Sequence, residues 1–173
     1  MARVTGGLAL VAVTASLAAD APAAEPTPPQ ALFRKSLLAD ARTTGAVKRL
    51  LRTGAGFVDA HVAFSDLTGD GKADAVVVVR SPGAAGAVAV YLFSTDGAPR
   101  GGNTTTDLRV VFRSQELYRA TTLVRPGALV VRTPIFAQDE DLCCASKLLE
   151  RDYRWDAKHR SFTRTDLREI KIG

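Results

Sequence analysis

Apolar and polar positions change their spacing along the chain, and the spacing predicts where helices and strands lie. From Gln30 to Arg52 apolar residues recur three or four positions apart, as in helices with one buried face. Thr43–Gly45 interrupts this pattern, so we expect two short helices. Thr44 is a suitable N-cap for the second helix, and Gly54 is a natural end for it.

Beyond Phe57 the apolar spacing shortens to two, which indicates strands with one solvated face. Ala75–Val79 and Ala87–Phe93 are instead continuous apolar runs, typical of strands buried on both faces. A Pro-Gly turn at Pro126 separates two further strands. Strands dominate and do not alternate regularly with helices. The sequence therefore predicts the α+β class, with N-terminal helices packed on a mainly antiparallel sheet of six to eight strands.

The beginning of the chain has the order of regions found in secretory signal peptides. One positive charge at Arg3 precedes an uncharged, mostly apolar stretch from Val4 to Ala19, and small residues follow. This stretch is shorter than the roughly 20 residues that a bilayer span requires, which argues against a transmembrane span. Cleavage after Ala18 or Ala23 fits the pattern, so we expect a secreted or cell-envelope protein.

Composition fits one folded domain after that cleavage. Removal of 23 of the 173 residues would leave 150, and 46% of the chain is hydrophobic against 24% charged. We therefore expect a signal peptide at 1–23, a Pro-rich leader at 24–29 and a single domain at 30–173. The net charge is +5, but acidic and basic residues alternate near the C-terminus. This alternation predicts solvated strand faces, with no specific nucleic-acid partner and at most weak contact with an anionic wall or lipid surface.

Asp66–Asp74 has the ligand spacing of a calcium loop. Side-chain oxygens stand at positions one, three, five and nine, and Gly71 at position six permits a sharp turn. Crowded carboxylates repel one another unless a cation neutralises them. The alternative is a metal-free turn between two strands. The expected Ca²⁺ ligands are Asp66, Thr68, Asp70, the backbone carbonyl of Lys72, and Asp74.

The loop resembles the DxDxDGxxD segments of FG-GAP and integrin-type β-propeller repeats, which join two strands. The resemblance covers these nine residues and the flanking strands, with Thr68 standing where those repeats have Asp or Asn. It implies calcium binding by a single loop. A whole propeller is excluded, because four blades of about 40–45 residues would exceed the mature chain.

Cys143 and Cys144 are adjacent and are the only cysteines in the chain. In an oxidising compartment they would pair, although adjacent Cα atoms lie about 3.8 Å apart and ordinary disulfides prefer about 4.4–6.8 Å. We expect a vicinal disulfide that shapes a loop. Two free thiols, and intermolecular bridges or metal ligation, are the alternatives. The missing C-x-x-C spacing argues against a redox enzyme.

A second pattern joins Cys143–Ser146, Tyr153–Asp156 and Phe162. It is similar to a C-C-P-S … Y-R-W-D-G-x-x-F pattern in exported proteins of unknown function from GC-rich Gram-positive bacteria, which also carry a D-x-x-G-D-G loop. Here Ala145 replaces the proline and Ala157 replaces the glycine. The resemblance implies a secreted or envelope-associated domain and brings no activity with it.

Catalytic motifs do not stand out. The two histidines, His61 and His159, are expected on the surface, and no G-x-S-x-G, H-E-x-x-H or P-loop pattern is present. We therefore expect an exported, non-catalytic binding or envelope-associated domain with an unknown extracellular ligand. The alternatives are a secreted hydrolase or enzyme inhibitor with an unrecognised site, and a purely structural domain.

Overall fold

The computed structural model describes residues 27–95 and 108–172. The expected signal peptide and its cleavage sites lie outside the described residues. Helix α1 (Pro28–Ala39) begins within the Pro-rich leader expected at 24–29. Pro28 and Pro29 occupy the first turn of this helix. Proline suits that position, since a first-turn N–H has no partner within the helix. The Gln30 side chain accepts a hydrogen bond from the backbone N–H of Thr27 at 2.7 Å and so caps this end.

Helix α2 (Gly45–Thr53) follows after a short turn, as the sequence predicts. The Thr44 hydroxyl accepts a hydrogen bond from the N–H of Val47 at 3.5 Å. Gly54 ends the helix at a φ of +74°, a left-handed conformation that glycine adopts without steric cost. Neither of the described helices is long and apolar enough to cross a membrane.

The strands of the described residues form two antiparallel sheets. The five-stranded sheet contains β1 (Phe57–Val58), β2 (Ala63–Ser65), β3 (Asp74–Ser81), β4 (Gly86–Ser94) and β5 (Arg109–Ser114). The four-stranded sheet contains β6 (Thr121–Arg125), β7 (Ala128–Ile135), β8 (Lys147–Asp156) and β9 (Ser161–Lys171). In the first sheet β1 and β2 both pair with β3, which is followed by β4 and β5. The second sheet keeps the chain order.

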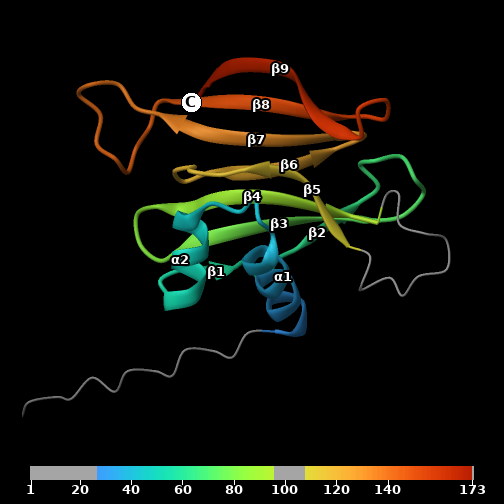
Figure 1. Cartoon of the computed structure of the whole chain (residues 1–173). Helices are drawn as coiled ribbons and strands as arrows, with labels where there is room; N and C mark the ends of the chain where they lie inside the picture. The colour runs from blue at the N-terminus through green and yellow to red at the C-terminus, as the bar shows by residue number, and fades with distance from the viewer. Residues whose placement is uncertain (1–26, 96–107, 173) are drawn as a thin grey trace, which may run out of the picture.

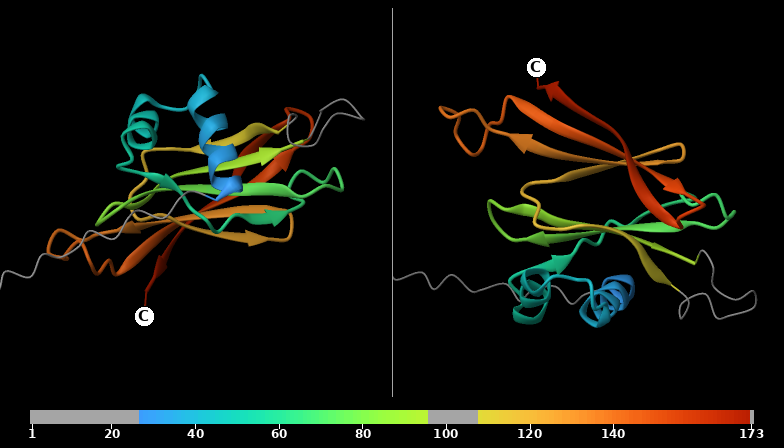
Figure 2. Two further views of the ribbon diagram at one scale, coloured as in Figure 1. Left: turned by 90° about the horizontal axis from the view of Figure 1, so that it is seen from below. Right: turned by 45° about the horizontal axis from the view of Figure 1, so that its top comes forward.

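The helices, the first sheet and the second sheet form three layers (Figures 1 and 2). One face of β3 and β4 contributes Val77 and Tyr91 to a buried cluster that also contains Phe33 of α1. The opposite face contributes Val76, Leu92 and their neighbours to a cluster with β7 and β8 of the second sheet. Both faces of these strands are buried, which explains their continuous apolar sequences.

The α+β class is confirmed. The sequence predicts six to eight strands in a single sheet, and this is wrong, because the described residues form nine strands divided between two sheets. The chain passes from β5 to β6 through residues 115–120. Within this crossover Glu116 and Arg119 have φ angles of +61° and +49°, which are uncommon for residues other than glycine. The N–H of Leu117 donates to the carbonyl of Val88 at 2.9 Å, so the crossover stays attached to β4 while it changes sheets.

Candidate functional site

Asp74 is the first residue of β3, and its side chain is only 1% exposed. One carboxylate oxygen accepts hydrogen bonds from the N–H groups of Leu67 and Thr68 at 2.7 and 2.8 Å. The hydroxyl of Thr68, which is also buried, donates to the other oxygen at 3.3 Å. Two of the expected calcium ligands are therefore bonded to each other at the base of the loop.

Asp66 and Asp70 lie on the exposed part of the same loop. The carboxylate of Asp66 accepts hydrogen bonds from the N–H groups of Gly69 and Gly71 at 2.7 and 3.0 Å. Asp70 accepts one from the N–H of Lys72 at 2.8 Å. Gly71 has a φ of +80°, which fits the sharp turn expected there. Each exposed carboxylate thus curls the loop by accepting bonds from its backbone.

The loop joins β2 to β3, which pair antiparallel with Ser65 opposite Asp74. This placement between two strands is the one that the resemblance implies. Within residues 27–95 and 108–172, no group of three or more His, Cys, Asp or Glu side chains is arranged to hold a metal ion. Calcium binding at Asp66–Asp74 therefore remains a proposal.

A disulfide joins Cys143 to Cys144 in the segment between β7 and β8, with the two Cα atoms 3.8 Å apart. The vicinal bridge expected from the sequence is present. Glu140 closes this segment, because its carboxylate accepts hydrogen bonds from the N–H groups of Ala137 and Ser146 at 2.8 and 3.3 Å. Hydrogen bonding from Ser146, followed by that from Ala137, lowers the pKa of Glu140.

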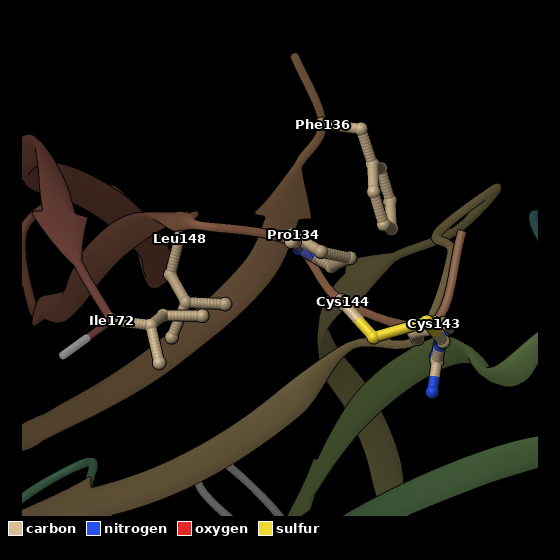
Figure 3. A pocket seen from close by; sticks show the side chains of 8 residues that line it. Pro134, Phe136, Cys143, Cys144, Leu148 and Ile172 are labelled. Carbon is tan, nitrogen blue, oxygen red and sulfur yellow. A yellow bond between two sulfur atoms is a disulfide. The ribbon is translucent and has the colours of Figure 1, made fainter. Parts of the chain in front are cut away.

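An open hollow of about 350 Å³ adjoins the disulfide (Figure 3). This volume lies within the range of about 300–1,000 Å³ that small-molecule sites occupy. Ile172, which lines this hollow, is 48% exposed, which is high for a large apolar residue. We call this feature the disulfide hollow. Its lining consists of Arg119, Pro134, Phe136, Cys143, Cys144, Ala145, Leu148 and Ile172.

Segments far apart in the sequence build the disulfide hollow, and Figure 3 shows how their side chains lie. The bridge lies toward one end, the ring of Pro134 lies between, and Leu148 and Ile172 lie together toward the other end. Pro134 and Leu148 are register partners on β7 and β8. The N–H of Ile172 donates to the carbonyl of Ser146 at 2.8 Å, which brings the end of β9 to the same place.

Arg119 contributes the charged group of the disulfide hollow. Its guanidinium donates a hydrogen bond to the carbonyl of Leu142, and its backbone N–H donates to the carbonyl of Ala85 at 2.8 Å. Among the described residues, its partners are these carbonyls and no carboxylate pairs with it. No local pattern in the sequence marks Arg119, because its position depends on the crossover between the sheets.

A buried carboxylate is a second feature that the sequence did not reveal. Glu150 of β8 has no exposed surface, and Arg125, Arg132 and Arg168 surround it from β6, β7 and β9. Arg125 lies 3.1 Å and Arg132 2.5 Å from its oxygens. Burial raises the pKa of Glu150, but the hydrogen bonds from the three arginines outweigh burial and lower the pKa to about 2.

The interpretation of the C-terminal charges as simply solvated strand faces is therefore incomplete. Arg132 and Arg168 stand directly opposite Glu150 in the ladders of β7 and β9, so their charges cover a buried acid. Both histidines are exposed as predicted, and each lies beside a carboxylate. His61 is 3.4 Å from Asp59, and His159 is 2.6 Å from Asp156.

These features define an α+β domain of two antiparallel sheets, with an Asp/Gly loop at one place and a disulfide-lined hollow at another. Comparison of the chain with protein-family models, with curated proteins and with solved structures finds no match. Function must therefore be inferred from the residues of the chain.

Proposed function

We propose that this chain is an exported, non-catalytic binding domain, secreted or held in the cell envelope, and that the disulfide hollow is its binding site. The vicinal disulfide is the observation that carries the proposal. Disulfides persist mainly in oxidising compartments outside the cytoplasm. A bridge between adjacent residues also restricts the loop that lines the hollow, and a pre-organised loop loses less entropy when a ligand binds.

The chemistry of the lining supports binding over catalysis. The residues around the disulfide hollow are apolar apart from Arg119 and the bonded sulfurs. General acid–base catalysis needs a group that takes up and releases a proton near the working pH, and arginine keeps its proton there. Mostly apolar walls with one fixed polar group are common in sites that hold a small molecule.

Calcium binding at Asp66–Asp74 is a second candidate activity. The exposed carboxylates of Asp66 and Asp70 favour it, because both lie on one curled loop in a sequence with calcium-loop spacing. In this proposal Asp74 and Thr68 shape the base of the loop. The helices and the first sheet serve as the scaffold that carries it.

Expression of the full chain in a Gram-positive secretion host tests the main proposal. We expect a product in the medium that starts at Ala19 or Ala24 and has the mass of a form with one disulfide. NMR of that product with a small-molecule library should show shifts confined to the backbone amides of residues 119, 135–148 and 172. Retention in the cytoplasm with an intact N-terminus would contradict export, and a library without any such shifts would contradict binding.

A further inference from the structure

We infer that the disulfide hollow binds small organic acids, and that Arg119 recognises their carboxylate while the apolar walls hold a ring or alkyl chain. This inference rests on the proposed function, because it names the ligand class of the same site. Arg119 has no role in the expectations drawn from the sequence.

The walls favour an apolar ligand body. Phe136, Pro134 and Leu148 present a ring, a pyrrolidine and a branched alkyl group to one space of about 350 Å³. The sulfurs of the bridge add a polarizable surface, and sulfur makes favourable contacts with aromatic rings. Ile172 is 48% exposed at this space, so a ligand would remove apolar surface from water.

The charge of Arg119 favours an acid over a neutral ligand. A guanidinium has five N–H donors, and the bond to the carbonyl of Leu142 uses one nitrogen without neutralising the charge. Carboxylates match the planar fork of guanidinium, and such charge-assisted pairs are stronger than neutral hydrogen bonds. The arginines around Glu150 differ, because each already contacts a carboxylate.

Arg119 is held in place by its backbone. Its φ of +49° is uncommon for a residue with a side chain, and the hydrogen bond to Ala85 holds that conformation at the β3–β4 turn. A Cβ added at Gly86 would lie 3.4 Å from the Cα of Arg119, which shows how closely the two backbones pack. Left-handed residues of this kind are enriched at ligand sites, where surrounding contacts fix them.

A second hollow extends the basic surface beside Arg119. It has a volume of about 260 Å³, and Arg119, Arg80 and Thr121 contribute to its walls. The guanidinium of Arg80 contacts Asp59, so its charge is balanced within the protein. Arg119 lines both hollows, and its charge, unlike that of Arg80, is available to a ligand.

Binding of 2-naphthoate and of its neutral analogue 2-naphthamide tests this inference. Both are titrated into the ¹⁵N-labelled, disulfide-intact chain, and the amide shifts give the site and the affinity. We expect shifts at Phe136, Ala145 and Leu148. We also expect naphthoate to bind about tenfold more tightly than naphthamide, which corresponds to about 1.4 kcal/mol.

Arg119→Gln should lower the affinity for naphthoate about tenfold and leave the affinity for naphthamide unchanged, because only the charge is lost. Arg164→Gln, which removes a charge from an exposed site on β9, should change neither affinity. Ile172→Ser should weaken both ligands by a similar factor. If the NMR spectrum of Arg119→Gln loses its dispersion, that variant has not folded. Arg119→Lys then serves as the test, because it keeps the charge and should keep the preference for the acid.

Equal affinities for acid and amide at the disulfide hollow would overturn the carboxylate inference and leave the proposed binding function intact. Shifts outside the hollow, or none with either probe, would overturn the inference as well. Failure of export would contradict the proposed function while the preference for the acid still stood, so the two failures are distinguishable.

Discussion

The carboxylate of Asp74 accepts a hydrogen bond from the backbone N–H of Thr68 at 2.8 Å, at a site almost closed to solvent. The same carboxylate oxygen accepts the N–H of Leu67 at 2.7 Å. Buried backbone donors require a partner, and here one side chain serves two of them. The hydrogen bonds of Asp74 thus stabilise the fold without a bound metal ion, whereas Asp66 and Asp70 accept hydrogen bonds on the exposed side of the loop.

Asp74→Ala should lower the free energy of unfolding by about 3 kcal/mol, because two buried N–H groups lose their acceptor. Asp66→Ala should lower it by about 1 kcal/mol, since water can replace the carboxylate at an exposed position. Urea unfolding in the presence of a chelator measures both. Equal losses of unfolding free energy in the two variants would show that burial of Asp74 does not make its hydrogen bonds more stabilising than those of Asp66.

Calcium should raise the melting temperature of the native chain if the loop binds it. At a free concentration of 100 times the Kd, one site adds about 2.7 kcal/mol. Asp70→Ala should abolish the increase with little change in stability in chelator, because Asp70 accepts a single bond from Lys72 on the surface. Differential scanning calorimetry with calcium and with chelator measures the shift.

A matched variant controls for the loss of one negative charge. Asp139 is exposed between β7 and β8, away from the Asp66–Asp74 loop in the sequence. Asp139→Asn should keep the full calcium effect. An identical melting temperature with calcium and with chelator in the native chain would reject calcium binding at the loop, and the metal-free turn would then stand.

Glu150→Gln should lower the free energy of unfolding by about 3 kcal/mol. The amide keeps the shape of the side chain but removes the buried negative charge. Arg125 and Arg168 keep Asp152 and Asp166 as partners, whereas Arg132 loses the one carboxylate that it contacts among the described residues. Glu169→Gln is the matched control, because Glu169 is 58% exposed and pairs with Lys147 on the surface. That variant should change stability by less than about 1 kcal/mol. Chemical denaturation at neutral pH compares the two.

Low pH should lower the free energy of unfolding, because the Glu150 carboxylate becomes protonated. The pKa of Glu150 is about 2 in the folded chain against 4.5 for the ordinary side chain, so folding favours the ionised form. The stabilisation is complete above about pH 4.5 and is lost as the pH falls toward 2. Glu150→Gln should therefore show a shallower loss of stability over this range. If the unfolding free energy falls equally steeply with pH in the native chain and in Glu150→Gln, groups other than Glu150 cause the acid sensitivity.

Local sequence signals predicted much of the fold because their causes are local. Thr44 and Gly54 define the ends of α2 through hydrogen bonding and a left-handed turn, which depend on neighbouring residues. The apolar runs of β3 and β4 indicated burial on both faces. The same run is compatible with cover by helices or by another sheet, so the pattern could not show that the strands divide into two sheets.

The disulfide was also predictable, because the two cysteines are adjacent. Arg119 and Glu150 were not, since their surroundings come from strands distant in the chain. Arg125 lies 25 residues from Glu150, and Arg132 and Arg168 lie 18 residues away on either side. Only the register of β7, β8 and β9 brings such charges together. Alternating signs in one sequence segment do not indicate which acid will be buried.

Gly56 and Gly45 provide a final test of the packing between α2 and the first sheet. A Cβ at Gly56 would lie 3.0 Å from the carbonyl oxygen of Arg80 and 3.0 Å from the Cβ of Leu50, so the backbone of β3 or α2 must move. Gly56→Ala should therefore destabilise the chain by about 1–2 kcal/mol. A Cβ at Gly45 meets nothing within 4 Å, and alanine restricts the unfolded chain more than glycine does. Gly45→Ala should accordingly stabilise the chain by about 0.5 kcal/mol. Thermal unfolding of both variants gives the two signs, and a neutral or stabilising Gly56→Ala would show that the helix is not held closely against the edge of the first sheet.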